Sequence, residues 1–430
     1  MIIFSLTVGL IILLALGVPV SLSLILSGAI GYLFNMGSIN GFLQLYVVPL
    51  KMSYSLSNFL LLSIPLFIMA AKVMNSSSIT KKIFGFANTA VGWLPGGLGH
   101  ANVFASLLFA GMSGTAVSDA AGLGSIEIEA MKNEGYDAEF AAAVTAASST
   151  VGPIFPPSVP MVMFATVSSV SVGSLFLAGV VPGVIMTIAM MILVYVIAKK
   201  RNYPRAPFPT VKSFAKGFID AFIPLLTPII LLVGIWTGVF TTTESAVIAT
   251  AYAILISFVL YRDMSFKSLF RIFKETAIDT ASIGLVVAAA AFYGWVLARS
   301  GLTVALAEWV VSVAKTPTMF LIMINVFFLI IGCFLESIAA ILIFGPILVS
   351  PAVAIGVDPL VLGLVIVLNL SLGLLTPPFG IVLFITKDMA KVSFGKMVKA
   401  VLPFFVPLFG TLILITFCPQ IATFLPHLLS

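Results

Sequence analysis

Charged side chains are scarce in this chain of 430 residues. Asp, Glu, Lys and Arg together make up 8%, apolar residues make up 61%, and the mean hydropathy is +1.23. A soluble core of this chain length cannot bury so much apolar surface, so the composition excludes a soluble globular protein. Cysteine and histidine are also rare. We expect Cys333 and Cys418 to be small core residues rather than a disulfide or metal framework, and His100 and His427 to lie at the membrane interface.

Apolar runs of helical length recur along the chain. They include residues 2–16, 180–198, 221–240, 246–261 and 318–331. Their lengths favour helices over the short alternating strands of a β-barrel. The sequence therefore predicts an all-α integral membrane protein in the lipid bilayer, with about a dozen spanning or re-entrant helices.

The basic residues are clustered, which gives the orientation. Lys and Arg crowd residues 199–216, a polar connection that also contains three prolines. By the positive-inside rule this linker is cytoplasmic, and it divides the chain into halves, 1–198 and 217–430. Residues 262–274 form a second basic loop on the same side. Since these are short loops between apolar runs, topology explains the charge better than nucleic-acid binding, and we expect no nucleic-acid partner.

An internal repeat relates the two halves. Residues 111–157 match residues 332–378 without a gap, chiefly at residue types that set the backbone path. The matched pairs are Gly111 and Gly332, Gly124 and Gly345, Gly135 and Gly356, Asp137 and Asp358, Gly152 and Gly373, and Pro156-Pro157 and Pro377-Pro378. Repeats with interrupted hydrophobic segments at corresponding places are typical of secondary transporters, whose binding site lies where the breaks meet.

The lysines indicate that the repeats are inverted. Lys387, Lys391, Lys396 and Lys399 follow the second Pro-Pro pair, whereas residues 166–179, after the first pair, include no basic residue. The two connections should therefore lie on opposite sides of the membrane, which a parallel repeat would not give. Each half is then expected to supply scaffold helices, a re-entrant hairpin and a broken helix. The hairpins are expected around 104–130 and 325–355, and the broken helices around 137–165 and 358–386.

The first hairpin tip is predicted at residues 111–119. Small and hydroxyl-bearing residues permit a tight reversal at membrane depth, although they could also form a helix-packing face. We favour the tip because Gly111, Ser113, Gly114 and Thr115 are nearly consecutive. Asp119 would then lie just inside the second arm, near that helix's amino end, where the helix dipole favours a carboxylate and gives it a capping role.

A helix break is predicted at residues 146–158, where Gly152 and three prolines interrupt an apolar run. Each proline removes a donor and clashes with the preceding turn, so carbonyl groups are freed to coordinate a cation. A plain proline kink is the alternative. The repetition of the pattern at 371–378 makes that alternative the weaker one.

Glu336 lies in the second tip, at the position that matches Thr115. A carboxylate within an apolar run costs about 2.5 to 3.5 kcal/mol on insertion scales, so it should face a cavity or a partner. The other interpretations of Glu336 are a helix-start cap or a charge that lies shallow in the membrane interface. For Thr241 to Glu244, capping alone is sufficient.

The residue types at the breaks suggest the coupling ion. Ser, Thr, Gly and freed carbonyls offer neutral oxygen ligands that suit Na⁺, and no relay of buried carboxylates and histidines is visible for a proton. Half-helix amino ends suit a carboxylate substrate. We expect sodium as the coupling ion, no other cofactor, and no enzyme activity, because paired Asp, Ser-His and HExxH patterns are missing.

The motifs at 111–119, 152–158 and 373–380 resemble those of the large membrane subunit of tripartite ATP-independent periplasmic (TRAP) transporters. The resemblance covers nearly the whole chain. It implies a multi-pass protein of the bacterial inner membrane with an elevator mechanism, in which a transport domain slides against a scaffold. It also implies two partners, a periplasmic substrate-binding protein and a small four-helix membrane subunit. We expect the latter to be a separate chain.

The same resemblance implies the site residues. One sodium site would use Ser113, Gly114, Ser149, Val151 and Gly152. The other would use Gly332, Glu336, Gly373 and Thr376. Substrate would bind near Ser113, Thr115, Ser158 and Glu336. The chain departs from the family pattern at Glu336, where Asp is frequent, and at Thr242, where proline is common.

The solute is the least defined part of this prediction. Family substrates include C4-dicarboxylates, 2-oxo acids, ectoines and sialic acids, and we favour sialic acid. The alternative class is a sodium/dicarboxylate-type carrier that works without a binding protein.

Overall fold

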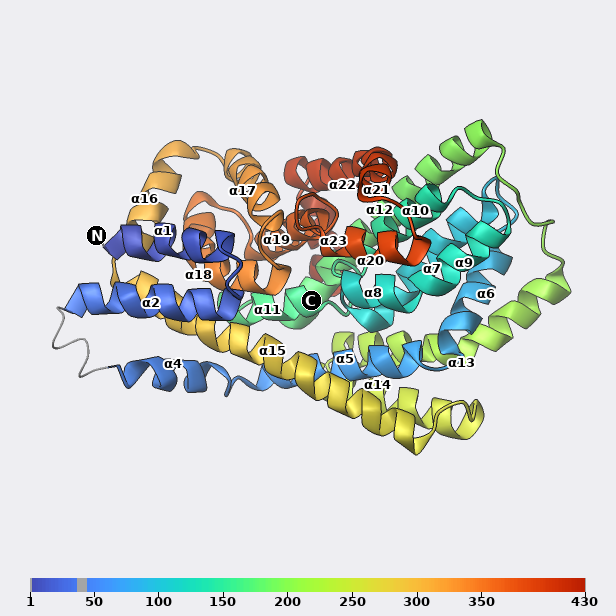
Figure 1. Cartoon of the computed structure of the whole chain (residues 1–430), viewed down its shortest axis with the longest axis horizontal. Helices are drawn as coiled ribbons and strands as arrows, with labels where there is room; N and C mark the ends of the chain where they lie inside the picture. The colour runs from blue at the N-terminus through green and yellow to red at the C-terminus, as the bar shows by residue number, and fades with distance from the viewer. Residues whose placement is uncertain (1, 37–44, 430) are drawn as a thin grey trace.

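The computed structural model describes residues 2–36 and 45–429, and within these ranges every regular element is a helix. The helices form one elongated body (Figure 1). The all-α prediction is confirmed. The high apolar content explains why: in a bilayer, a helix satisfies its backbone hydrogen bonds within its own segment.

Six stretches in the described residues are long and apolar enough to span a membrane. They are α12 (Val172–Arg201), α13 (Val211–Trp236), α14 (Thr242–Leu255) with its π-helical extension, α15 (Phe266–Arg299), α18 (Ser337–Ile355), and α21 (Phe394–Val401) continuing into α22 (Phe405–Phe417). A seventh candidate is α4 (Val47–Ser55) followed by η1 (Phe59–Leu62) and α5 (Ser63–Asn75), bent by 62°. Four shorter apolar helices accompany them, so the expected dozen includes segments too short to span alone.

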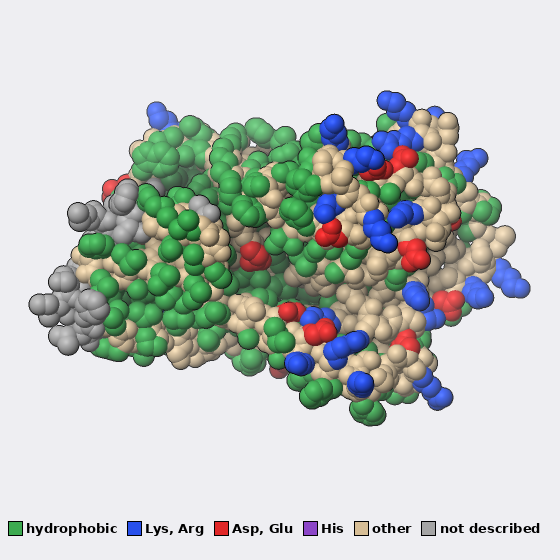
Figure 2. All heavy atoms as spheres, viewed as in Figure 1, with side chains coloured by type: hydrophobic (Ala, Val, Ile, Leu, Met, Phe, Trp, Pro, Cys, Tyr) green, Lys and Arg blue, Asp and Glu red, His purple; other side chains and the backbone are tan. Residues whose placement is uncertain are grey.

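The non-helical connection between the halves is shorter than the basic linker expected from the sequence. Helix α12 continues to Arg201 and α13 begins at Val211, so residues at both edges of the expected linker, 199–216, are helical. Lys and Arg side chains gather at this end of the molecule, whereas the opposite end is mostly apolar (Figure 2). The positive-inside rule assigns the basic end to the cytoplasm.

Helix α15 crosses much of the molecule and packs against α2 (Val20–Met36), α4, α5 and α18 (Figure 1). Helix α1 (Ile2–Ala15) is joined to this group because the Tyr293 hydroxyl donates a 2.9 Å hydrogen bond to the Leu6 carbonyl. On the other side, α6 (Ile79–Val91) packs against α13, and α23 (Gln420–Leu429) packs against α12. Helix α16 (Leu302–Val313) contacts α18. These outer helices surround the two repeated segments.

Three minor expectations are wrong. Cys418 is exposed and Cys333 is only partly buried, so neither is a fully buried core residue. His100 is buried, with 2% of its surface exposed, rather than interfacial. Hydropathy alone could not place these residues, because helix packing decides which face of an apolar helix is covered.

Candidate transport site

The first hairpin turns where the small residues predict it. Helix α7 (Gly97–Ser113) ends at Gly114, whose φ of +65° is the left-handed conformation that glycine adopts without strain. Thr115 then caps α8 (Ala116–Gly122), its hydroxyl accepting a 3.2 Å hydrogen bond from the Ser118 amide. Helix α9 (Gly124–Asn133) completes the second arm. The tip interpretation is confirmed, because the helix ends here instead of continuing as a packing face.

Asp119 lies just inside the second arm, in the first turn of α8, as expected, but it is not the capping residue. Thr115 caps the second arm, and Asp119 lies one turn inside it, with 1% of its surface exposed. Neither carboxylate oxygen of Asp119 has a hydrogen-bond partner among the described residues. A β-hydroxyl next to the glycine reaches the free amides first, because the cap must precede the first helical turn.

The first broken helix is observed at the predicted prolines. Helix α10 (Ala138–Ser149) ends, turns occupy the following residues, and α11 (Val159–Ser168) begins after the Pro-Pro pair. The Val159 amide donates a 3.1 Å hydrogen bond to the Gly114 carbonyl. A Cβ at Gly152 would approach the Thr115 carbonyl to 3.1 Å. The hairpin tip therefore packs directly on the break, backbone against backbone.

This packing brings Ser113, Gly114, Ser149 and Gly152 into one neighbourhood. The Ser113 hydroxyl is buried and has no hydrogen-bond partner within the described ranges. The Ser149 hydroxyl donates to the Ala146 carbonyl at 2.8 Å. Val151 offers a carbonyl that already accepts from two amides, at 2.9 and 2.8 Å. Ser113 thus has the free oxygen in this group.

Ser158, expected beside the substrate, caps α11. Its hydroxyl accepts from the Met161 amide at 3.2 Å and donates to the Pro153 carbonyl, and the side chain is fully buried. Thr115 is partly buried, and Glu336 is exposed. Glu336 is therefore the most accessible of the expected substrate residues.

The second hairpin repeats the arrangement with different side chains. Helix α17 (Pro317–Gly332) ends, and Glu336 caps α18. Its Oε2 atom accepts from the Ile338 and Ala339 amides at 3.0 and 3.2 Å. The capping interpretation is confirmed, and Thr115 and Glu336, matched in sequence, have the same structural role. The accessible carboxylate can still meet a ligand, because both cap bonds use one oxygen.

The second broken helix also matches its prediction. Helix α19 (Pro359–Gly373) ends before the Pro-Pro pair, and α20 (Ile381–Ala390) follows it. A Cβ at Gly373 would lie 2.4 Å from the Gly332 carbonyl oxygen, so hairpin and break again touch through their backbones. The Thr376 hydroxyl donates to the Leu372 carbonyl at 2.8 Å. The Pro-Pro peptide is cis in both breaks.

Sequence reasoning missed the polar residues that join each hairpin to its broken helix. Asn102 Nδ2 donates to the Thr145 hydroxyl at 2.7 Å, and the Ser106 and Ser148 hydroxyls are 3.0 Å apart. In the second half, Asn369 Nδ2 donates to Asn325 Oδ1 at 2.8 Å. Polar residues spaced one turn apart inside apolar helices were the available signal.

The two broken helices run in opposite directions past each other. Helix α10 packs against α20, and α11 packs against α19. At the basic end, Lys396, just beyond α20, pairs with Glu139 at the start of α10 at 2.9 Å. The Lys132 ammonium donates to the Ala390 carbonyl at 3.3 Å. Thus α10 begins at the end of the molecule where α20 finishes.

A second polar cluster lies at this basic end. Asp137, at the start of α10, accepts a 2.5 Å hydrogen bond from the Tyr203 hydroxyl and pairs with Arg201 at 2.7 Å. The Tyr203 hydrogen bond, followed by the Arg201 guanidinium, lowers the pKa of Asp137 below its ordinary value.

At the start of α14, Thr241 and Glu244 form the expected cap, with each side chain bonding the other's backbone amide.

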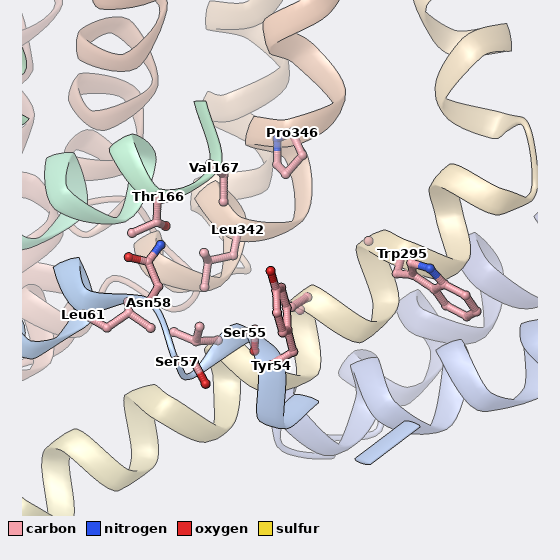
Figure 3. A pocket seen from close by; sticks show the side chains of 14 residues that line it. Tyr54, Ser55, Ser57, Asn58, Leu61, Thr166, Val167, Trp295, Leu342 and Pro346 are labelled. Carbon is pink, nitrogen blue, oxygen red and sulfur yellow. The ribbon is translucent and has the colours of Figure 1, made fainter. Parts of the chain in front are cut away.

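A cavity of about 710 Å³ separates outer helices from the repeated segments. Tyr54 and Asn58, at the bend between α4 and η1, and Trp295 on α15 line one side (Figure 3). Thr166, at the end of α11, and Leu342 on α18 line the other. The outer helices therefore pack incompletely against α11, which follows the first break, and against α18, which follows the second tip.

Helical spans, two hairpin tips packed on two helix breaks, and basic residues at one end define a multi-pass membrane transport protein. The family model described as the tripartite ATP-independent periplasmic transporter, DctM component, matches residues 7–421. The chain belongs to this family. It is a large permease subunit in the bacterial inner membrane, and not an enzyme.

Individual relatives agree with that assignment. The chain is 41% identical to the sialic acid TRAP transporter large permease protein SiaM of Vibrio cholerae, over 96% of this chain and 95% of SiaM. It is 34% identical to the C4-dicarboxylate TRAP transporter large permease protein DctM of Pseudomonas aeruginosa, over 95% and 94% of the two chains. The YdaH transporter of Alcanivorax borkumensis has a similar fold, with a TM-score of 0.64 at 15% identity, covering 89% of each chain.

Proposed function

We propose that this permease drives sodium-coupled uptake of an organic acid anion by an elevator mechanism. The observation that carries the proposal is the twofold occurrence of a hairpin tip packed on a helix break. Such interruptions leave backbone carbonyls and helix amino ends free for a cation and a carboxylate. The opposite directions of α10 and α20 support an inverted repeat.

The moving body would include both hairpins and both broken helices, from α7 to α11 and from α17 to α20. The scaffold would include α4, α5, α13, α14 and α15. The cavity between α15 and the α11 and α18 side supports this division, because a sliding boundary is packed less completely than a core. The two repeats would correspond to the halves predicted from the sequence, 1–198 and 217–430.

For sodium, we assign the first site to Ser113, Gly114, Ser149, Val151 and Gly152, and the second to Gly332, Glu336, Gly373 and Thr376. The free Ser113 hydroxyl gives the sharpest test. Ser113→Ala removes an oxygen without breaking a hydrogen bond among the described residues, so folding should be preserved. The sodium concentration for half-maximal uptake should rise about tenfold, equivalent to ~1.4 kcal/mol.

A matched control is Ser125→Ala, because Ser125 is exposed on the neighbouring helix. Its sodium dependence should equal that of the unmodified chain. Unchanged sodium dependence in Ser113→Ala would remove Ser113 from the site.

The solute is proposed to be a carboxylate that binds near Ser113, Thr115, Ser158 and Glu336. The names of the V. cholerae and P. aeruginosa relatives support sialic acid or a C4-dicarboxylate, and the higher identity to the former favours sialic acid. Uptake of labelled sialic acid that unlabelled succinate fails to inhibit would support this choice. Uptake that is inhibited by unlabelled succinate and not by unlabelled sialic acid would favour a C4-dicarboxylate instead.

Membership of the family supports two partners, a periplasmic binding protein and a small four-helix membrane subunit in a separate chain. Reconstitution of the permease with and without each partner tests this dependence. Full uptake by the permease alone would instead favour a carrier that needs no binding protein.

A further inference from the structure

Two carboxyl groups lie inside the first hairpin without a neutralising partner. Asp119 on α8 has 1% of its surface exposed, and Glu127 on α9 has none. All four of their oxygens lack a hydrogen-bond partner in the part of the chain that the structure describes. The two groups are close enough to interact electrostatically, and the Ser106 hydroxyl lies beside Asp119.

The surrounding helices offer no described counter-ion to this pair. Helices α5, α7, α10 and α20 pack against α8 or α9. The titratable residues on these helices and on α9 itself are Lys72, His100, Glu129, Lys132, Glu139, Lys387 and Asp388. Lys72 pairs with Asp279, Glu139 with Lys396, and Lys387 with Asp388, while Lys132 donates to a carbonyl. Glu129 is exposed, and both ring nitrogens of the buried His100 lack partners among the described residues.

Leaving both carboxyl groups ionised would be costly. A buried ion without a partner loses its hydration, and a second negative charge nearby adds repulsion. A bound proton removes one of the two charges and turns that carboxyl group into a hydrogen-bond donor. The described residues contain no group of three or more Asp, Glu, His or Cys that could hold a metal ion. A sodium ion held with hydroxyl and carbonyl oxygens is the other possible occupant, and the spectroscopic experiment below distinguishes it from a proton.

We propose that Asp119 and Glu127 form a proton-binding site inside the first hairpin. With its proton bound, the pair has a single negative charge at most, and the hairpin has less charge to move across an apolar surrounding. As the pH rises and the proton is lost, the added charge should slow this movement. The predicted effect on transport rests on the elevator function proposed above. The prediction of a bound proton does not depend on that function.

Infrared spectroscopy of the purified protein detects the proton directly. The unmodified chain should show the carbonyl stretch of a protonated carboxylic acid at neutral pH, shifted in heavy water. Glu127→Gln and Asp119→Asn should each remove or displace this band. Glu129→Gln, an exposed change on the same helix, should leave it unchanged.

The absence of the band from the unmodified protein, or its persistence in both pair variants, would overturn the proposal. A band that disappears on addition of Na⁺ at constant pH would also overturn it, since the occupant would then be a metal ion. If neither variant folds, the spectrum of the unmodified chain alone still decides between a protonated and an ionised pair.

Transport gives the second measurement. Uptake by the unmodified chain should fall by at least severalfold between neutral and alkaline pH, while Glu127→Gln should stay nearly flat. An identical fall in both would contradict the role in movement. Loss of sodium coupling with an intact infrared band would instead remove the proposed function and leave the proton site.

Discussion

Single atoms decide how closely each hairpin meets its break. At Gly373 there is no room for a methyl group, because a Cβ would lie 2.4 Å from the Gly332 carbonyl oxygen. A Cβ added at Gly152 would lie 3.1 Å from the nearest atoms of Thr115. The matched pair Gly152 and Gly373 is thus explained by backbone proximity, and not by a positive φ, since neither residue has one.

Gly373→Ala should therefore destabilise the protein by about 1 to 3 kcal/mol, because a rigid carbonyl must move. Thermal unfolding in detergent measures this as a lower Tm. Gly410→Ala is the control, since a Cβ there has open space and alanine favours the helix. Equal melting temperatures for Gly373→Ala and the unmodified chain would show that the two segments are not in contact.

Glu336 combines a structural and an electrostatic role that substitutions can separate. Glu336→Gln keeps an oxygen for the Ile338 and Ala339 amides, so stability should hold while sodium-driven uptake falls at least tenfold. Glu336→Ala should lose the cap too, at about 1 kcal/mol. Normal uptake by Glu336→Gln would reduce this residue to a helix cap.

Among the helices, the start of α10 is held to the end of α12 by Asp137, Arg201 and Tyr203. Because the pKa of Asp137 is lowered in the folded state, its stabilisation is present above the unfolded-state pKa. That stabilisation is lost as the pH falls through the folded-state value. This contact joins a proposed moving element to α12 at the basic end of the molecule.

Asp137→Asn should cost up to about 1 kcal/mol at neutral pH, a small value because both partners are half exposed. The difference from the unmodified chain should shrink in acid, where Asp137 is protonated in both states. Melting curves across pH measure it, with the exposed Glu134→Gln as control. A difference that stays constant down to strongly acid pH would contradict the assignment.

The sequence was most informative about helix interruptions. Pro156, Pro157, Pro377 and Pro378 located both breaks because proline cannot continue a helix, and Gly114 located the first tip. The sequence was least informative about which polar side chains are buried and which helices they contact. The burial of Asp119 and His100 depends on neighbouring helices that local composition does not specify.

At the scale of the whole molecule, the positive charges predict the orientation in the membrane, and labelling tests this prediction. Lys212 lies at the basic end, near the start of α13. With Cys333 and Cys418 replaced by serine, Lys212→Cys should react with an impermeant thiol reagent only when the cytoplasmic face is open to it. Labelling from the periplasmic side would show that the topology is the reverse of the predicted one.

The cytoplasmic linker, the repeat boundaries and the direction of the second half were predicted from charge and from one repeated pattern, and they stay predictions. The cavity beside Tyr54 and Trp295 could not be predicted, because it depends on how distant helices fail to pack. Long-range packing of this kind leaves little trace in a single sequence, whereas local backbone requirements leave glycines and prolines.

Uptake by proteoliposomes that contain this permease together with the small subunit and the binding protein proposed as its partners tests the central claim most directly. With an inward sodium gradient, labelled solute should accumulate, and removal of the gradient or of the binding protein should abolish accumulation. Accumulation that is equally strong without a sodium gradient would contradict sodium-driven transport through the paired hairpins and breaks.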